Sequence, residues 1–162
     1  MPRAKRMADQ EWMFDKIIQA TGPDFYWPMT EETLGTVGMD GSGDIRSVRS
    51  AIRKFSDITD EMCRIAGKRE AMARQAEEDG HGVTSGQNYF MAAAYYTMAQ
   101  GPIHEDGNPR NAELSARKNA CYDSYIAHAP HPIERVDIPF EGSALPGLLH
   151  LPSNATGKTP CV

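Results

Sequence analysis

The change in residue pattern at Ala129-Pro-His-Pro132 constrains the fold of this chain most strongly. Its two prolines, Pro130 and Pro132, prevent a helix from continuing through it. Beyond it, apolar side chains occupy every second position at Val136, Ile138 and Phe140, which is the period of a β-strand. The same period places Leu145, Gly147, Leu149 and Leu151 on one face. The Glu141-Gly-Ser143 turn divides this stretch into two halves, so the sequence predicts a β-hairpin.

The residues before the prolines favour helices. Apolar residues recur at helical spacing in five stretches, which span residues 8–20, 45–55, 56–79, 84–100 and 109–127. Thr84 and Gln87 form a capping-box pattern that predicts the start of the fourth helix. Asn108-Pro109 supplies an N-cap and a first-turn proline for the fifth. The fourth helix is apolar around much of its circumference, so we expect it to be buried between its neighbours.

The hairpin is expected to be the beginning of a larger sheet. A polar loop over residues 153–158 leads to a short run, 159–162, that predicts one further strand. Because a sheet that has only begun cannot bury both faces, the sequence predicts a truncated α/β protein. We expect a mainly α domain over residues 1–130, followed by a hairpin and one strand of an α/β sheet over residues 131–162.

Composition excludes several classes of function. The chain is 40% apolar and 24% charged, as in globular proteins, and its net charge of −5 argues against nucleic-acid binding. No apolar stretch approaches the length of a membrane span. Cys63, Cys121 and Cys161 lack metal-ligand spacing, which favours reduced thiols. A cytoplasmic protein without nucleic-acid or membrane partners is the expectation.

Motifs that carry chemistry are missing from the sequence. The glycine run over residues 35–43 has neither a Walker lysine nor a preceding strand, so it predicts a turn and not a phosphate site. No serine lies in Gly-x-Ser-x-Gly, the turn that exposes a hydrolase nucleophile. Prolines keep His128 and His131 from the helical spacing of a metal pair. We therefore predict no catalytic residue, metal site or cofactor here.

The remaining candidates are residues that bind a substrate. Tyr89, Tyr95 and Tyr96 could line a pocket for an aromatic ligand, although aromatic residues at this density more often pack helices together. Tyr96 is the first candidate because it lies close to the loop that carries His104. His104 is the second, since binding residues gather in loops, although a solvated charged loop is the simpler interpretation.

Three stretches, in this order and spacing, resemble one family of proteins. They are Gly82–Tyr96, Ile133–Gly142 and Leu145–Pro152. In them the chain resembles the N-terminal part of helical-lid α/β-hydrolases, which include 2,6-dihydroxypseudooxynicotine hydrolase, fungal polyketide-shortening hydrolases and fermentation–respiration-switch esterases. The resemblance implies a serine hydrolase that cleaves an ester or a carbon–carbon bond beside a ketone. It also implies that the triad and the oxyanion loop follow the residues present here.

The sequence leaves several alternatives open. On the first hypothesis the chain supplies the lid and substrate enclosure of such an enzyme, is inactive alone, and forms a homodimer through its helical region. Whether it is a fragment, a truncated product or a split-enzyme subunit stays open. A second hypothesis is a non-enzymatic, tetratricopeptide-like binding module, because residues 56–79 and 84–100 form a helical pair. A third is a degenerate remnant that folds marginally, since its hairpin has no sheet to join.

Overall fold

The computed structural model describes residues 9–25, 38–154 and 157. Within them the chain is mainly helical and ends in a two-stranded antiparallel sheet. The helices and strands are α2 (Glu11–Thr21), α4 (Ser42–Ala51), α5 (Asp57–Glu78), α6 (Gly82–Gln100), α7 (Pro109–His128), β1 (Ile133–Phe140) and β2 (Ser143–His150), with short 3-10 turns η1 (Pro23–Phe25) and η2 (Met39–Gly41). The predicted order of helices followed by a hairpin is confirmed. The predicted strand over residues 159–162 lies outside the described residues.

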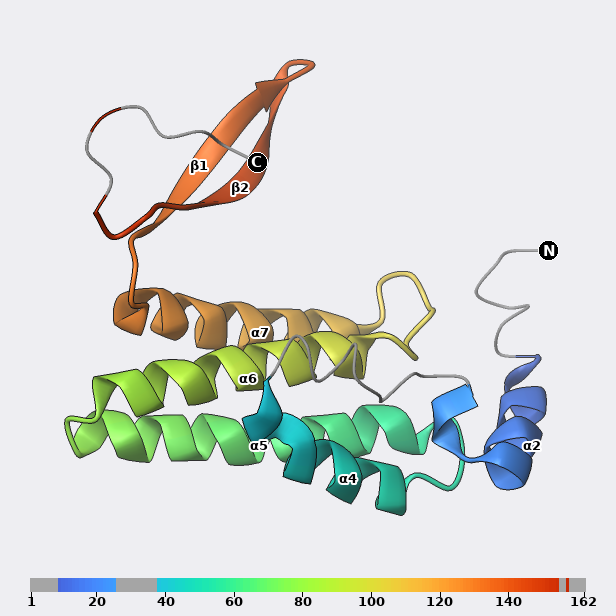
Figure 1. Ribbon diagram of the computed structural model, residues 1–162. Helices are drawn as coiled ribbons and strands as arrows, with labels where there is room; N and C mark the ends of the chain where they lie inside the picture. The colour runs from blue at the N-terminus through green and yellow to red at the C-terminus, as the bar shows by residue number, and fades with distance from the viewer. Residues whose placement is uncertain (1–8, 26–37, 155–156, 158–162) are drawn as a thin grey trace.

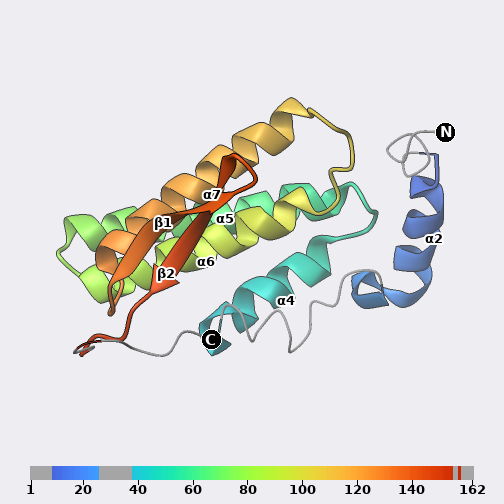
Figure 2. The same cartoon turned by 90° about the horizontal axis from the view of Figure 1, so that it is seen from above.

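Helices α5, α6 and α7 form the main layer of the protein. Figure 1 shows α6 between the other two, which agrees with its contacts to both, and Figure 2 shows the same three helices from above. Helix α6 is buried because small and aromatic residues cover most of its circumference; Ala92, Tyr95, Tyr96 and Ala99 are all fully enclosed. The predicted burial of this helix between its neighbours is therefore confirmed.

The turn between α5 and α6 corrects one prediction. The His81 amide donates to the Ala76 carbonyl at 2.7 Å and the Gly80 amide to the Glu77 carbonyl at 3.0 Å, which is the Schellman pattern. Gly80 has the left-handed φ of 78° that this motif requires. The next helix begins at once, at Gly82, so Thr84 lies inside its first turn and caps nothing. The predicted capping box is wrong.

The other helix ends follow the predictions more closely. The Asn108 side chain accepts a hydrogen bond from the Arg110 amide at 2.9 Å, so the predicted cap of α7 is confirmed. Helix α4 spans Ser42–Ala51, whereas the sequence predicted residues 45–55. It ends earlier because Ile52 is extended and Asp57 accepts hydrogen bonds from the Arg53 and Lys54 amides. The described part of the glycine run, residues 38–43, forms η2 and the start of α4.

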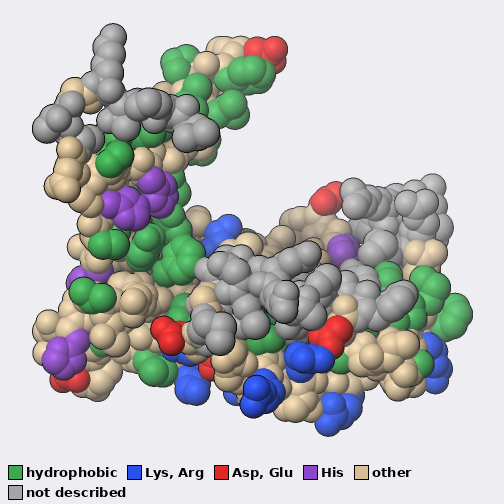
Figure 3. All heavy atoms as spheres, in the orientation of Figure 1, with side chains coloured by type: hydrophobic (Ala, Val, Ile, Leu, Met, Phe, Trp, Pro, Cys, Tyr) green, Lys and Arg blue, Asp and Glu red, His purple; other side chains and the backbone are tan. Residues whose placement is uncertain are grey.

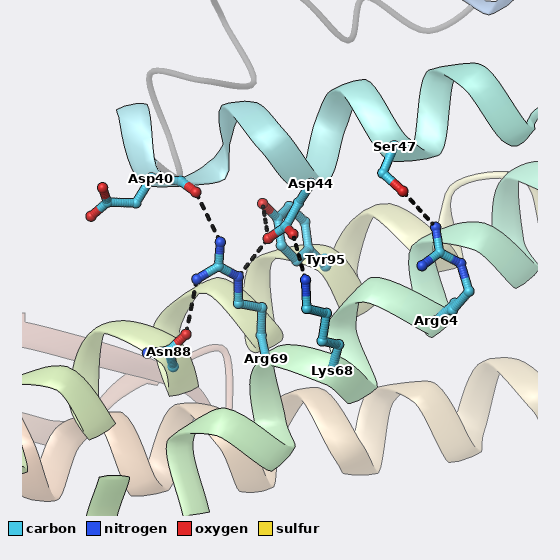
Figure 4. A network of polar contacts seen from close by, with 8 residues as sticks. All are labelled: Asp40, Asp44, Ser47, Arg64, Lys68, Arg69, Asn88 and Tyr95. Atoms are coloured by element: carbon cyan, nitrogen blue, oxygen red, sulfur yellow. Dashed lines mark hydrogen bonds and ion pairs between the residues drawn. The ribbon is translucent and has the colours of Figure 1, made fainter. Parts of the chain in front are cut away.

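A buried polar network fixes α4 to the main layer (Figure 4). Arg69 of α5 donates to Asp44 of α4 at 2.5 Å, to Asn88 of α6 at 3.0 Å, and to the Asp40 carbonyl at 2.8 Å. Tyr95 also points at Asp44, 3.5 Å away. Asp44 is almost fully buried, so these partners must compensate for the loss of water around its carboxylate. The network sets where α4 lies across α5 and α6.

The hairpin projects from the end of α7, as Figure 1 shows. Glu141 and Gly142 both have positive φ, 44° and 80°, as a type I′ turn requires. In the register that this turn sets, Ile138 pairs with Leu145 and Arg135 pairs with Leu148. The first pair lies on one face of the hairpin and the second on the other, because neighbouring side chains alternate.

Candidate functional site

A groove lies between α6, α7 and the hairpin, with a volume of about 510 Å³. Figure 3 shows the molecule hollowed between the projecting hairpin and the helices, with apolar side chains at the base of the hairpin. The residues that line the groove come from stretches far apart in the sequence and are Phe90, Ala93, Ala94, Thr97, Met98, Lys118, Asn119, Tyr122, Arg135 and Leu148. We call this space the hairpin groove.

The α6 wall of the hairpin groove is apolar and recessed. Its residues recur every three or four positions, so they share one face of the helix. Ala93 and Ala94 leave space that a longer side chain would fill. The one hydroxyl on this wall, Thr97, donates to the Ala93 carbonyl at 2.9 Å and is therefore satisfied within the helix. This wall suits the apolar part of a ligand.

An aromatic cluster supports the opposite wall. Tyr125 lies 5.1 Å from Phe90 and 5.4 Å from Tyr122, measured between ring centroids. Tyr122 lines the groove, and its hydroxyl lies 3.3 Å from the Nε2 atom of His150. Burial raises the Tyr122 pKa above its ordinary value, so this hydroxyl stays protonated at neutral pH.

Polar contacts at the base of the hairpin hold the third wall in place. His131 Nε2 and His150 Nδ1 share a hydrogen bond of 2.8 Å, and the Leu151 amide donates to the Pro132 carbonyl at 2.9 Å. Arg135 of β1 forms an ion pair with Asp123 of α7. The ion pair joins the hairpin to α7, whereas the other two hydrogen bonds close the base of the hairpin itself.

Two cationic side chains reach the groove, Lys118 from α7 and Arg135 from β1. Arg135 is partly neutralised by Asp123. Lys118 forms no ion pair with any of the described residues. The hairpin groove therefore combines apolar walls with a cationic rim.

Tyr96, the first predicted binding residue, lies in the helical layer. Its side chain is fully buried, and its hydroxyl donates to Glu70 at 2.8 Å. The Arg117 guanidinium stacks over its ring at 4.6 Å and also donates to Glu70 at 2.9 Å. Burial and the neighbouring carboxylate raise the Tyr96 pKa well above its ordinary value. These contacts link α5, α6 and α7.

His104, the second predicted binding residue, lies at a different place. Its ring stacks on Phe55 with 6.0 Å between centroids, just before α5 begins. The Nε2 atom is buried and has no hydrogen-bond partner among the described residues. Glu70, the hydrogen-bond partner of Tyr96, lies about 20 Å along α5 from the start of that helix, because an α-helix rises about 1.5 Å per residue. The structure therefore does not bring Tyr96 and His104 together, and a substrate contact by either remains a prediction.

The hairpin groove was not predicted from the sequence. Its residues come from three separate elements, and no local motif marks them. One signal was available: Lys118 has Leu114, Ser115, Cys121 and Tyr122 as its helical neighbours, with no acidic residue among them. Within the described ranges, no group of three or more His, Cys, Asp or Glu residues could hold a metal ion. No helix there is long and apolar enough to cross a membrane.

Comparison with known proteins finds partial homology to two hydrolases. The chain is 28% identical over 92 residues to the esterase FrsA of Photobacterium profundum, covering 57% of this chain and 22% of that protein. It is 37% identical over 79 residues to the hydrolase ORFZ of Pyricularia oryzae, covering 46% of this chain and 18% of that protein. The chain thus spans about a fifth of the length of these curated relatives. No family model matches the chain.

These matches are consistent with a relationship to the α/β-hydrolases. Both relatives are named for hydrolytic activity, and the matches cover about half of this chain. A helical layer followed by an antiparallel hairpin is compatible with the leading part of such an enzyme. The chain is partly homologous to hydrolases.

Proposed function

We propose that this chain supplies the helical lid and first strands of a serine-dependent α/β-hydrolase. The enzyme would act on a carbonyl compound, either an ester or a carbon–carbon bond beside a ketone. The observation that carries the proposal is the partial homology to two proteins named as an esterase and a hydrolase. The mainly helical fold with a terminal hairpin supports it.

The hairpin groove is the place where we propose that substrate is enclosed. Its volume of about 510 Å³ falls within the range of small-molecule pockets, and its walls are mostly apolar. Acyl transfer by a serine nucleophile benefits when water is excluded, because the oxyanion is then stabilised by fixed hydrogen-bond donors. This chain would bind the substrate and exclude water from it. The serine, its base and the oxyanion donors would be supplied by the rest of the enzyme.

A chimera tests this role. Hydrolase ORFZ would be assayed with aryl esters and a β-diketone after the segment that aligns with this chain is deleted, and again after that segment is replaced by this chain. We expect the replacement to restore turnover that the deletion abolishes. A folded chimera as inactive as the deletion protein would contradict the proposal.

The isolated chain provides a second test. Purified and incubated with the same aryl ester and β-diketone, it is expected to show no turnover above a mock preparation. Turnover that copurifies with the chain would place an active site within these residues and would overturn the proposed division of roles.

A further inference from the structure

Lys118 occupies an unusual electrostatic position in the hairpin groove. It lies on α7 between Leu114 and Tyr122, and no acidic residue stands three or four positions away on either side. Lys118 is half-buried, and within the described part of the chain no carboxylate pairs with it. A lysine that lines an apolar groove rests its carbon chain on the wall and keeps its ammonium at the rim.

Arg135 adds a second set of donors to the same groove. A guanidinium carries five N–H donors, and the ion pair with Asp123 engages one nitrogen, Nη2. Asp137 shares the face of β1 that carries Arg135, but it is exposed and does not line the groove. With Lys118 and Arg135 positive and Asp123 negative, the groove carries one uncompensated positive charge.

The remaining walls fit the apolar body of a ligand, and two of them are aromatic. Phe90 and Tyr122 both line the groove and are held by contacts with Tyr125. Aromatic side chains stack favourably on a flat ring, which an aliphatic wall cannot do as well. Apolar walls with a few convergent polar groups are typical of small-molecule sites.

We propose that the hairpin groove binds an organic carboxylate with an aromatic body, its carboxylate lying between Lys118 and Arg135. The proposal rests on the proposed function in using the groove for a small molecule, and it names the class of that molecule. Hydrolysis of an ester or of a bond beside a ketone adds hydroxyl to the acyl carbon and a proton to the leaving group. One product is thus a carboxylic acid, which matches this ligand class.

Equilibrium binding to the full 162-residue chain tests the proposal. The probes are 2-naphthoate and its neutral isostere 2-naphthamide, titrated at neutral pH and low salt and followed by the naphthyl fluorescence. We expect 2-naphthoate to bind about tenfold more tightly, since charge-assisted hydrogen bonds are stronger than neutral ones. Raising the salt concentration should weaken this preference.

Matched lysine variants locate the site. Lys118→Gln is expected to remove most of the preference for 2-naphthoate, while Lys118→Arg keeps it. Lys54→Gln, at an exposed lysine between α4 and α5, should leave both affinities unchanged. Circular dichroism checks that each variant keeps the helical content of the native chain.

The outcomes separate this proposal from the proposed function. Equal affinity for the two probes would overturn the carboxylate class and leave substrate enclosure standing. Absence of saturable binding by either probe would overturn the proposed ligand site, whereas the proposed function is decided separately by the chimera. A preference that survives Lys118→Gln would show that the carboxylate binds elsewhere and would overturn the site.

Discussion

Replacing Gly86 with alanine tests how closely the end of α7 packs on α6. A Cβ atom at Gly86 would lie 2.9 Å from the His128 Cβ and 3.2 Å from the His128 carbonyl oxygen. His128 is the last residue of α7, and the hairpin follows it after four residues. Glycine at this position therefore lets α7 approach α6 at the point from which the hairpin projects.

Two opposing effects decide how much Gly86→Ala changes the free energy of unfolding. Alanine in a helix interior is favoured over glycine by about 1 kcal/mol. Overpacking a close contact costs about 1–3 kcal/mol, and here one of the crowded atoms is a backbone oxygen that cannot rotate away. We expect overpacking to win, with a net loss of stability of up to about 2 kcal/mol. For a chain of this size that lowers Tm by up to about 8 °C.

Gly67 of α5 provides the matched control. Its added Cβ would lie 3.8 Å from the Tyr96 hydroxyl and 3.9 Å from Arg117 Nη2, which are ordinary contacts. Gly67→Ala should therefore stabilise the protein by up to about 1 kcal/mol. Both free energies come from urea unfolding followed by far-ultraviolet circular dichroism, with the slopes compared. If the two alanine variants were equally stabilised, the close packing of α7 on Gly86 would be refuted.

Other predictions concern the polar clusters of the helical layer. Arg69→Met should cost about 3 kcal/mol in urea unfolding, because it leaves the buried Asp44 carboxylate with only the more distant Lys68 ammonium as a cationic partner. Met in place of the exposed Arg64 should cost less than about 1 kcal/mol, and similar losses for the two variants would contradict this. Burial alone would raise the Glu70 pKa, but hydrogen bonds from neighbouring donors hold it below its ordinary value of 4.5. The unfolding free energy should thus fall as pH drops below about 4.5, and Glu70→Gln should flatten that dependence. Burial raises the Cys121 pKa to about 11, so native protein at pH 8 should resist alkylation of this thiol by iodoacetamide until it is denatured; rapid labelling in peptide mass spectrometry would disprove this.

Most of the local structure could be predicted because it depends on residues close together in the sequence. The type I′ turn sets the register of the hairpin, and the alternation of Val136 and Ile138 with polar residues sets its faces. The cap at Asn108 was predictable because its acceptor lies two residues from its donor. The start of α6 was not, because the Schellman motif at Gly80 fixes it from the preceding helix.

The candidate site could not be predicted in the same way. Tyr96 and His104 are eight residues apart in the sequence, yet Tyr96 turns toward Glu70 while His104 folds back onto Phe55. The hairpin groove arises only when α6, α7 and the hairpin come together, and the Arg135–Asp123 ion pair links the hairpin to α7. Such a site is set by tertiary contacts that no local pattern encodes.

The hairpin itself limits how the proposed enzyme can be completed. Its face opposite the groove exposes about half of the Ile138 and Leu145 side chains, and an exposed apolar face of this kind marks an interaction surface. A two-residue turn makes Phe140 and Ser143 a hydrogen-bonded pair, so Pro139 and Pro146 fall at the alternate positions whose amides point outward. Each outer edge thus lacks one donor where a neighbouring strand would pair. If the proposed function holds, other parts of the hydrolase cover the apolar face of the hairpin. A further strand can then pair with an outer edge of the hairpin only at positions away from the proline on that edge.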